Sequence, residues 1–294
     1  MKYLEPTSLL DALVALSGHG EEVKVLAGGQ SLIPMLHLGL ARPGVLVGLQ
    51  RLSELAGISY DPGVGLRLGA MTTQRSIETS PQVRRCCPML AYMSSLIASV
   101  HVRHLGTLGG NLCHNLPGAD PPPALIALDA VVSLESIRGI RELPVADLFR
   151  GFLETAVEPD ELLTDVRIPD RALGNHAVYL KHSIRSVDPA LVGVAVRLAL
   201  ADDGVSCADV RVGVGGVSPV PYRAISAEKI LRNERLSSET IAAVAAVAAA
   251  ESDPMSDAHG SARYRRKMLE VIMRRALTAA WNGSRARAAV KEGG

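Results

Sequence analysis

The segment Val23-Lys24-Val25-Leu26-Ala27-Gly28-Gly29-Gln30-Ser31 passes from a short apolar strand into a glycine turn. A second turn of the same kind, Thr107-Leu108-Gly109-Gly110-Asn111, follows some eighty residues later. Glycine has no Cβ, so the backbone amides of such a turn can approach an anion, and a neighbouring hydroxyl adds a donor. One turn alone would equally suit a tightly packed strand-to-helix connection. Two of them predict a long anionic cofactor held from two sides by free amides.

The residues around the first turn predict a small β-α-β lobe. A strand at Val45–Leu49 follows the turn, and Ser31 is expected to cap the intervening helix. A larger lobe should follow. It is expected to contain a hairpin at 58–69, helices at 72–80 and 89–99, and two further strands at 131–136 and 161–169. We therefore expect one domain over 1–173, made of lobes at about 1–57 and 58–173.

A second domain is expected over 174–294. Its pattern predicts three antiparallel strands at 177–181, 191–200 and 205–217. Three helices are then predicted at 223–232, 237–251 and 262–281. The tail from Gly283 to Gly294 is expected to fray. The predicted fold class is therefore α+β.

Composition excludes several classes of function. With 294 residues, 48% hydrophobic residues and 21% charged residues, the chain has the balance of a folded protein of about two domains. A net charge of +1 and 3% aromatic residues argue against nucleic acid as a partner. The sequence contains no run of roughly 18 apolar residues and no signal peptide at its start. We therefore expect no membrane span and a cytoplasmic location.

Cysteine and histidine give little support for a metal in this chain. The four cysteines, at 86, 87, 113 and 207, form no C-x-x-C pair, so neither an iron–sulfur cluster nor structural zinc is expected. His101, Arg103, His104 and His114 surround the second turn, but no carboxylate or cysteine repeats at ligand spacing. These side chains are expected to neutralise phosphate or to contact a partner subunit.

Four pieces of the chain carry a resemblance to a known family. They are the first turn, the second turn with Ala119-Asp120-Pro121, Tyr179-Leu180-Lys181 with the following Arg185-x-x-Asp188-x-Ala190, and the basic helix that begins at Tyr264-Arg265-Arg266. Because these pieces are spread along the chain, it resembles over its whole length the FAD-binding medium subunit of the molybdenum hydroxylases of the carbon monoxide dehydrogenase and xanthine dehydrogenase type. The resemblance implies a two-lobed FAD-binding domain of the p-cresol methylhydroxylase (PCMH) type, which is vanillyl-alcohol-oxidase-like. A C-terminal three-stranded antiparallel sheet with helices completes the implied fold.

The resemblance also implies which residues bind FAD. The two turns would hold the diphosphate, an acid would contact the cofactor, an apolar residue would face the isoalloxazine, and a lysine would reach the flavin. These positions are Lys24, Val25, Leu26, Ala27, Gly28, Gly29, Gln30 and Ser31, then Thr107, Leu108, Gly109, Gly110 and Asn111, and finally Asp120, Leu163 and Lys181.

At two of these positions a purely structural role is the alternative to cofactor binding. At two other positions the chain departs from the family. Asp120 precedes three prolines and would also serve as the N-cap of a helix, and Lys181 would ordinarily be a solvated charge. Gln30 replaces the usual histidine of the first turn, and Ile97 replaces an aromatic residue that some relatives place near the ring.

The function implied by the resemblance is electron transfer. A molybdopterin large subunit would oxidise the substrate, a [2Fe–2S] small subunit would relay electrons, and FAD in this chain would pass them to an external acceptor. NAD⁺, oxygen, quinones and other carriers all remain open as that acceptor. The expected assembly is a dimer of heterotrimers, and no residue of this chain is expected to be catalytic. The alternatives are a stand-alone flavin oxidase that binds its own small organic substrate, and a nucleotide-binding module without redox activity.

Overall fold

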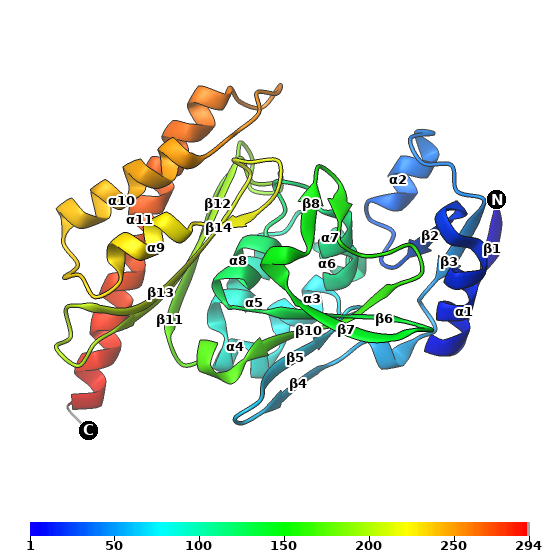
Figure 1. The fold of residues 1–294 in the computed structure, drawn as a ribbon, viewed down its shortest axis with the longest axis horizontal. Coiled ribbons are helices and arrows are strands. Elements are labelled where there is room, and N and C mark those ends of the chain that lie inside the picture. Colours follow the sequence, from blue (N-terminus) through cyan, green and yellow to red (C-terminus); the bar gives the residue numbers. More distant parts are fainter. Residues whose placement is uncertain (293–294) are drawn as a thin grey trace.

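The computed structural model of the protein describes residues 1–292, apart from the side chains of Glu21 and of residues 287–292. Three regions lie side by side along the long axis, in chain order from the N-terminus (Figure 1). Each region is organised around its own cluster of buried hydrophobic residues. Among the described residues, no helix is both long enough and apolar enough to cross a membrane.

The first region is a small lobe built on a parallel sheet with the strand order β1-β3-β2. Its elements are β1 (Lys2–Leu4), α1 (Leu9–His19), β2 (Val23–Leu26), α2 (Leu32–His37) and β3 (Val45–Gly48). The predicted β-α-β unit is present, and β1 adds a strand that the sequence pattern did not indicate. The glycine turn between β2 and α2 therefore leaves the carboxyl end of a parallel strand, where such sheets bind ligands.

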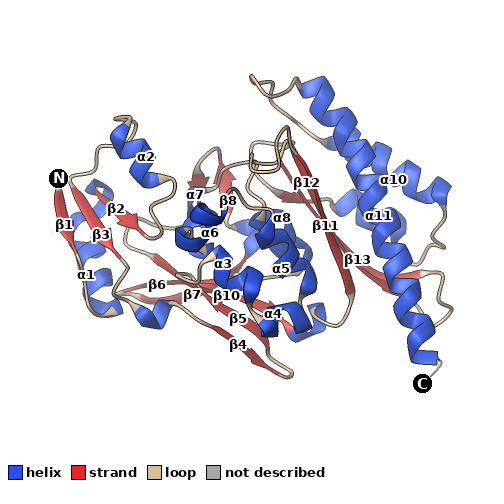
Figure 2. Cartoon of the chain, turned by 180° about the vertical axis from the view of Figure 1, so that it is seen from behind, coloured by secondary structure: helices blue, strands red, loops and turns tan. Residues whose placement is uncertain are grey.

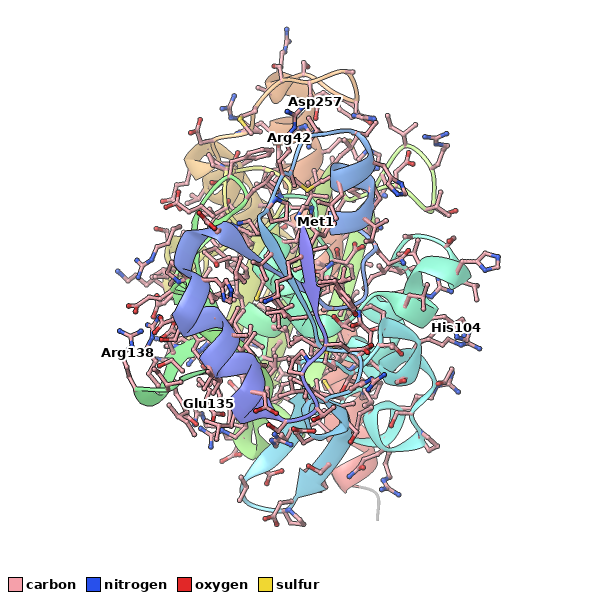
Figure 3. All side chains as sticks on the ribbon, turned by 90° about the vertical axis from the view of Figure 1, so that its right-hand side faces the viewer. Met1, Arg42, His104, Glu135, Arg138 and Asp257 are labelled. Carbon is pink, nitrogen blue, oxygen red and sulfur yellow. The ribbon has the colours of Figure 1, made fainter. Side chains whose placement is uncertain are left out.

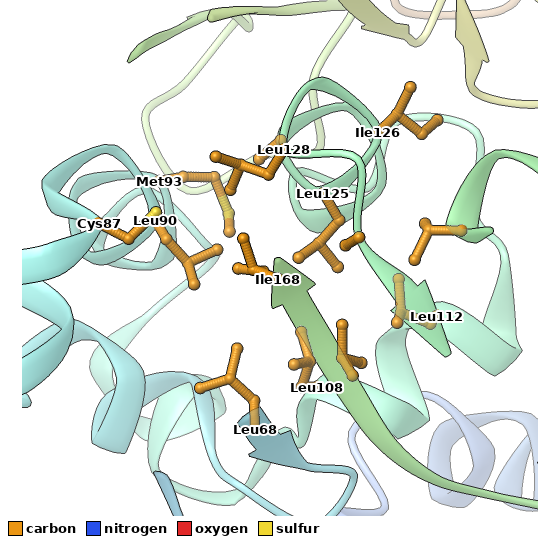
Figure 4. Packing of buried hydrophobic residues seen from close by; sticks show 14 of the residues in the cluster. Leu68, Cys87, Leu90, Met93, Leu108, Leu112, Leu125, Ile126, Leu128 and Ile168 are labelled. Carbon is orange, nitrogen blue, oxygen red and sulfur yellow. The ribbon is translucent and has the colours of Figure 1, made fainter. Parts of the chain in front are cut away.

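The central region is a five-stranded antiparallel sheet with the order β4-β5-β10-β6-β7 and helices packed against it. Its strands are β4 (Ile58–Asp61), β5 (Gly65–Gly69), β6 (Val131–Ser136), β7 (Gly139–Pro144) and β10 (Leu162–Pro169), with a small β8 (Phe149–Gly151) and β9 (Glu154–Thr155) hairpin. Its helices are α3 (Gln74–Thr79), α4 (Pro81–Cys86), α5 (Pro88–Ser95), α6 (Val100–Leu105), α7 (Leu108–His114) and α8 (Pro121–Ala127). Leucine, isoleucine and methionine side chains of strands and helices fill the space between them (Figure 4).

The third region holds an antiparallel sheet of four strands, where three were expected. The strands are β11 (His176–His182), β12 (Val192–Leu200), β13 (Cys207–Gly215) and the additional β14 (Tyr222–Arg223), followed by α9 (Ile225–Leu231), α10 (Ser238–Glu251) and α11 (Ala262–Glu292). Helices α10 and α11 run alongside one another beyond the sheet (Figure 2). The two-residue β14 was missed because its pairing comes from the tertiary contact with β13 and leaves no alternation in the sequence.

The expected fraying from Gly283 is wrong as far as Glu292, because α11 continues to that residue. Packing explains the extra length. Ser284 is buried and its hydroxyl donates to the Leu198 carbonyl on β12 at 3.2 Å. The Arg285 guanidinium lies 5.6 Å from the centre of the Trp281 ring. The last two residues, 293 and 294, lie outside the described part of the chain.

Helix α8 joins the central region to the C-terminal sheet. It packs against β12 and β13, on the side of the sheet away from α11. The approach is close, since a Cβ built on Gly213 of β13 would stand 2.0 Å from the Pro123 carbonyl oxygen. Asp120, at the start of α8, is thereby brought next to β11 of the C-terminal sheet.

Candidate functional site

A cavity of about 540 Å³ lies between the small lobe and the central region. Both glycine turns line it, together with residues 153–163 and the segment 187–189 between β11 and β12. Of the predicted cofactor residues, all line this cavity except Leu26, Leu108 and Lys181. Leu108 is instead fully buried in the central core, and Lys181 lies behind Asp120.

The two turns touch each other, although they are far apart in sequence. A Cβ built on Gly28 would stand 2.0 Å from the Leu105 carbonyl oxygen and 2.9 Å from the Gly106 Cα. A Cβ built on Gly110 would stand 3.4 Å from the Ala27 Cβ. Glycine at position 28 therefore lets the backbones of the two segments approach to a distance that a side chain would prevent.

The first turn presents free backbone amides to the cavity. From Gly28 to Ser31, no backbone amide donates a hydrogen bond to any other described residue. Gly29 has φ +71°, a left-handed conformation that favours glycine. The side-chain Nε2 of Gln30 donates to the Gly28 carbonyl oxygen at 3.1 Å and steadies the turn. The expected capping by Ser31 is wrong, because its side chain makes no hydrogen bond to α2. Its hydroxyl is therefore free for a ligand.

The second turn differs from the expectation, because its amides are occupied within the protein. The amides of Leu108 and Gly109 donate to the carbonyls of Thr72 and Ala70 at 2.9 and 2.8 Å. The Gly110 amide donates to the Thr107 hydroxyl oxygen at 3.2 Å, which caps α7. The physical reason is that α7 begins inside this turn and the central region supplies acceptors for it. The hydrogen of the Thr107 hydroxyl remains available to an anion.

Asp120 does not cap α8, because both of its carboxylate oxygens are engaged elsewhere. Oδ1 accepts from the Tyr179 hydroxyl at 2.7 Å, and Oδ2 accepts from the Lys181 ammonium at 2.9 Å. The side chains of Asp120 and Lys181 are each 5% exposed. Burial raises the pKa of Asp120 above its ordinary value, while the charge of Lys181 and the hydrogen bond from Tyr179 oppose that shift. Burial also raises the pKa of Tyr179, so its hydroxyl keeps its proton.

The remaining walls of the cavity combine apolar surface with unsatisfied polar atoms. Ile97 and Leu163 are 8% and 5% exposed and supply apolar surface. Gln74 Nε2 and Asn111 Oδ1 are buried in cavity-lining residues without a hydrogen-bond partner. Buried polar atoms of this kind are normally satisfied, so they indicate a ligand that offers both an acceptor and a donor. Together with the free amides of the first turn, these groups fit FAD.

Gln74 is a cavity residue that the sequence analysis missed. It is the first residue of α3 and is only 2% exposed. The preceding Thr73 caps the helix. The sequence Thr-Gln therefore indicates only the start of a helix, and it carries no signal of a ligand contact.

The basic residues near the second turn separate into different roles. His114 lines the cavity, whereas His104 is exposed and lies at the outer edge of the molecule (Figure 3). Arg103 is buried and forms an ion pair with Glu78 at 2.9 Å, so the expectation that it neutralises phosphate or contacts a partner is wrong. Among the side chains that the structure describes, no three from His, Cys, Asp or Glu are grouped as they would be around a metal ion.

Comparison with known proteins identifies two family models that together cover most of the chain. Residues 1–171 match the FAD binding domain in molybdopterin dehydrogenase, and residues 177–280 match the CO dehydrogenase flavoprotein C-terminal domain. The chain is 38% identical over 280 residues to the nicotine 6-hydroxylase medium subunit of Paenarthrobacter nicotinovorans, which covers 95% of this chain and 97% of that one. It is 35% identical over 280 residues to the carbon monoxide dehydrogenase medium chain of Hydrogenophaga pseudoflava, covering 95% and 96%.

Solved structures agree with this assignment. Carbon monoxide dehydrogenase from Hydrogenophaga pseudoflava matches with a TM-score of 0.92 and 35% identity, covering 96% of this chain and 97% of that one. Quinoline 2-oxidoreductase from Pseudomonas putida 86 matches with a TM-score of 0.90 and 33% identity, covering 97% and 98%. The predicted fold class and cofactor are confirmed. This chain belongs to the family of FAD-binding medium subunits of the molybdenum hydroxylases of the carbon monoxide dehydrogenase and xanthine dehydrogenase type.

Proposed function

We propose that this chain is an electron-transfer subunit that takes electrons from the [2Fe–2S] clusters of a small partner subunit and delivers them, through FAD, to an external acceptor. A molybdopterin large subunit would oxidise the substrate, and the assembly would be a dimer of heterotrimers. The relatives' names, which designate medium chains and subunits, support such companions. The observation that carries the proposal is the cavity, whose lining combines the free amides of the first turn with apolar side chains and with buried polar atoms that have no partner.

The first turn is proposed to bind the diphosphate of FAD. Its amides from Gly28 to Ser31 have no other acceptor, and the Ser31 hydroxyl is free of the helix that follows. The second turn contributes through the Thr107 hydroxyl and through its close contact with the first turn. Lys24, at the edge of the same cavity, adds positive charge near the anion.

The apolar wall of the cavity is proposed to hold the isoalloxazine. Ile97 and Leu163 would pack against the ring, and Gln74 would donate to one of its acceptors. Asp120 faces the cavity while Lys181 compensates its charge from behind, so the lysine acts on the cofactor through the aspartate. FAD, when bound, supplies the coupling between one-electron and two-electron transfer.

The C-terminal domain is proposed to begin at residue 174 and to support the cavity wall next to Asp120. Its strand β11 provides the side chain that pairs with Asp120, and the segment after β11 lines the cavity with Val187, Asp188 and Pro189. The domain over 1–173 then holds the cofactor, and the domain over 174–294 closes it from one side.

The proposal is tested by purifying the tagged chain with the polypeptides that accompany it and measuring molybdenum, iron and FAD. We expect all three in the assembly and FAD alone in the isolated chain. Mixing the FAD-loaded chain anaerobically with its reduced iron–sulfur companion should bleach the visible flavin bands. Bleaching of the isolated chain by a small organic substrate would instead identify a stand-alone oxidase. A chain that takes up no FAD would contradict the proposal altogether.

A further inference from the structure

A short loop between α5 and α6 forms part of the cavity wall. It spans residues 96–99, of which Ile97 and Ala98 line the cavity and Ser99 caps α6. Ala98 has φ +41°, which lies in the left-handed region that residues with a Cβ rarely adopt. A backbone in this conformation persists only where its surroundings hold it there.

The first three carbonyl groups of this loop, those of Leu96, Ile97 and Ala98, accept hydrogen bonds from buried cations. The Lys181 ammonium donates to the Leu96 oxygen at 3.0 Å. The Arg103 Nη1 donates to the Ile97 oxygen at 2.9 Å and to the Ala98 oxygen at 3.1 Å. The side chain of Arg103 is 9% exposed, and that of Lys181 is 5% exposed. The loop is therefore held from two sides by charged donors.

Each of the two cations is itself fixed by a carboxylate from another element. The Arg103 Nε donates to Glu78 Oε2 of α3 at 2.9 Å, and Lys181 pairs with Asp120 at the start of α8. Arg103 can serve both Glu78 and the loop because its planar guanidinium offers several donors at fixed angles. A lysine at the same position has a single nitrogen and could not reach all three acceptors at once.

We propose that Arg103 is a positioning residue for FAD, which pins the strained loop so that Ile97 presents its side chain to the flavin ring. The inference rests on the proposed function of the cavity as the FAD site. The alternative is that Arg103 only satisfies carbonyls at the end of α5 and leaves the cofactor unaffected. The two differ in whether the flavin itself responds when Arg103 is changed.

The test compares Arg103→Lys and Arg103→Gln with the matched control Arg75→Gln. Arg75 donates to the other oxygen of the same Glu78 at 2.9 Å but contacts no carbonyl of the loop. FAD affinity is measured by fluorescence titration of the full-length chain. The flavin absorption spectrum and midpoint potential are measured at matched saturation, and cooperative unfolding in urea shows that each variant is folded.

We expect Arg103→Gln to raise the Kd for FAD at least tenfold, which corresponds to about 1.4 kcal/mol, and to shift the flavin spectrum and potential. Arg103→Lys keeps the charge beside Glu78, so it should fold while still losing several-fold in affinity. Arg75→Gln should change the Kd less than twofold. If Arg103→Lys binds FAD like the unmodified chain with an unchanged spectrum and potential, or if Arg75→Gln loses as much affinity, the positioning role is overturned. Failure of the unmodified chain to bind FAD would instead refute the proposed function.

Discussion

Substitution of Gly28 by alanine tests the contact between the two turns most directly. The added Cβ would meet the Leu105 carbonyl oxygen at 2.0 Å, its carbon at 2.7 Å and the Gly106 Cα at 2.9 Å. All three are backbone atoms, so no side chain can rotate away. Ordinary contact begins at 3.4 Å, and the two turns must therefore separate by about 1.4 Å. Overpacking of this kind costs on the order of 1–3 kcal/mol in stability.

The same separation should weaken FAD binding. It moves the first turn away from the second, so at least one amide loses its contact with a diphosphate oxygen. A hydrogen bond to a charged group contributes about 1.5–3 kcal/mol, which converts to a roughly ten- to hundredfold increase in Kd. The assay is a fluorescence titration with FAD, accompanied by urea unfolding.

The matched control is Gly18→Ala in α1 of the same lobe. A Cβ at Gly18 meets nothing within 4 Å, and alanine in a helix is favoured over glycine by about 0.5–1 kcal/mol. This variant should bind FAD normally and be at least as stable as the unmodified chain. A Kd for Gly28→Ala within twofold of the unmodified value would refute the reasoning, because the turns would then not need their present separation.

Three further predictions concern charge near the cavity. Gly110→Asp should place a carboxylate beside the diphosphate and expel FAD, as measured by the flavin-to-protein ratio after purification, whereas Gly110→Ala should retain more of the cofactor. Asp120→Asn should leave the buried Lys181 ammonium unpaired and lower the free energy of unfolding by about 3–5 kcal/mol in urea titrations; an unchanged stability would show that the pair is not a buried ion pair. Burial tends to raise the pKa of Glu78, but hydrogen bonds from Arg103 and a second arginine outweigh it and lower the pKa below its ordinary 4.5. The contribution of ionised Glu78 to the free energy of unfolding is therefore present above pH 4.5 and lost as the pH falls through the lowered pKa. Glu78→Gln should flatten that part of the profile of unfolding free energy against pH.

The small lobe and the C-terminal sheet could be predicted because their determinants are local. The apolar strand at Val23–Leu26 runs directly into the turn that ends it, and β12 and β13 are long apolar runs rich in valine. The turns themselves followed from glycine chemistry. The first turn matches that expectation in its free amides.

The errors share one cause, which is that tertiary partners decided the outcome. For Asp120 the alternative of helix capping is excluded, because a tyrosine and a lysine from a strand about sixty residues away donate to its two oxygens, while its predicted contact with the cofactor stays a prediction. The amides of the second turn look free in the sequence, but carbonyls of residues 70 and 72 accept from two of them. Arg103 resembles a phosphate ligand by its position beside the turn, and only the packing of α3 and α6 shows that it points into the protein.

The shared ion pair between α8 and β11 has a consequence for how this polypeptide can be divided. Lys181 is contributed by one predicted domain and Asp120 by the other, and both are almost inaccessible to water. Splitting the gene at the linker near residue 174 would leave each fragment with an orphaned ionic group. It would also expose α8 on the N-terminal fragment and the sheet face beneath α8 on the C-terminal one. Expression of the N-terminal part as a minimal flavin module should therefore fail unless the missing half is supplied in trans.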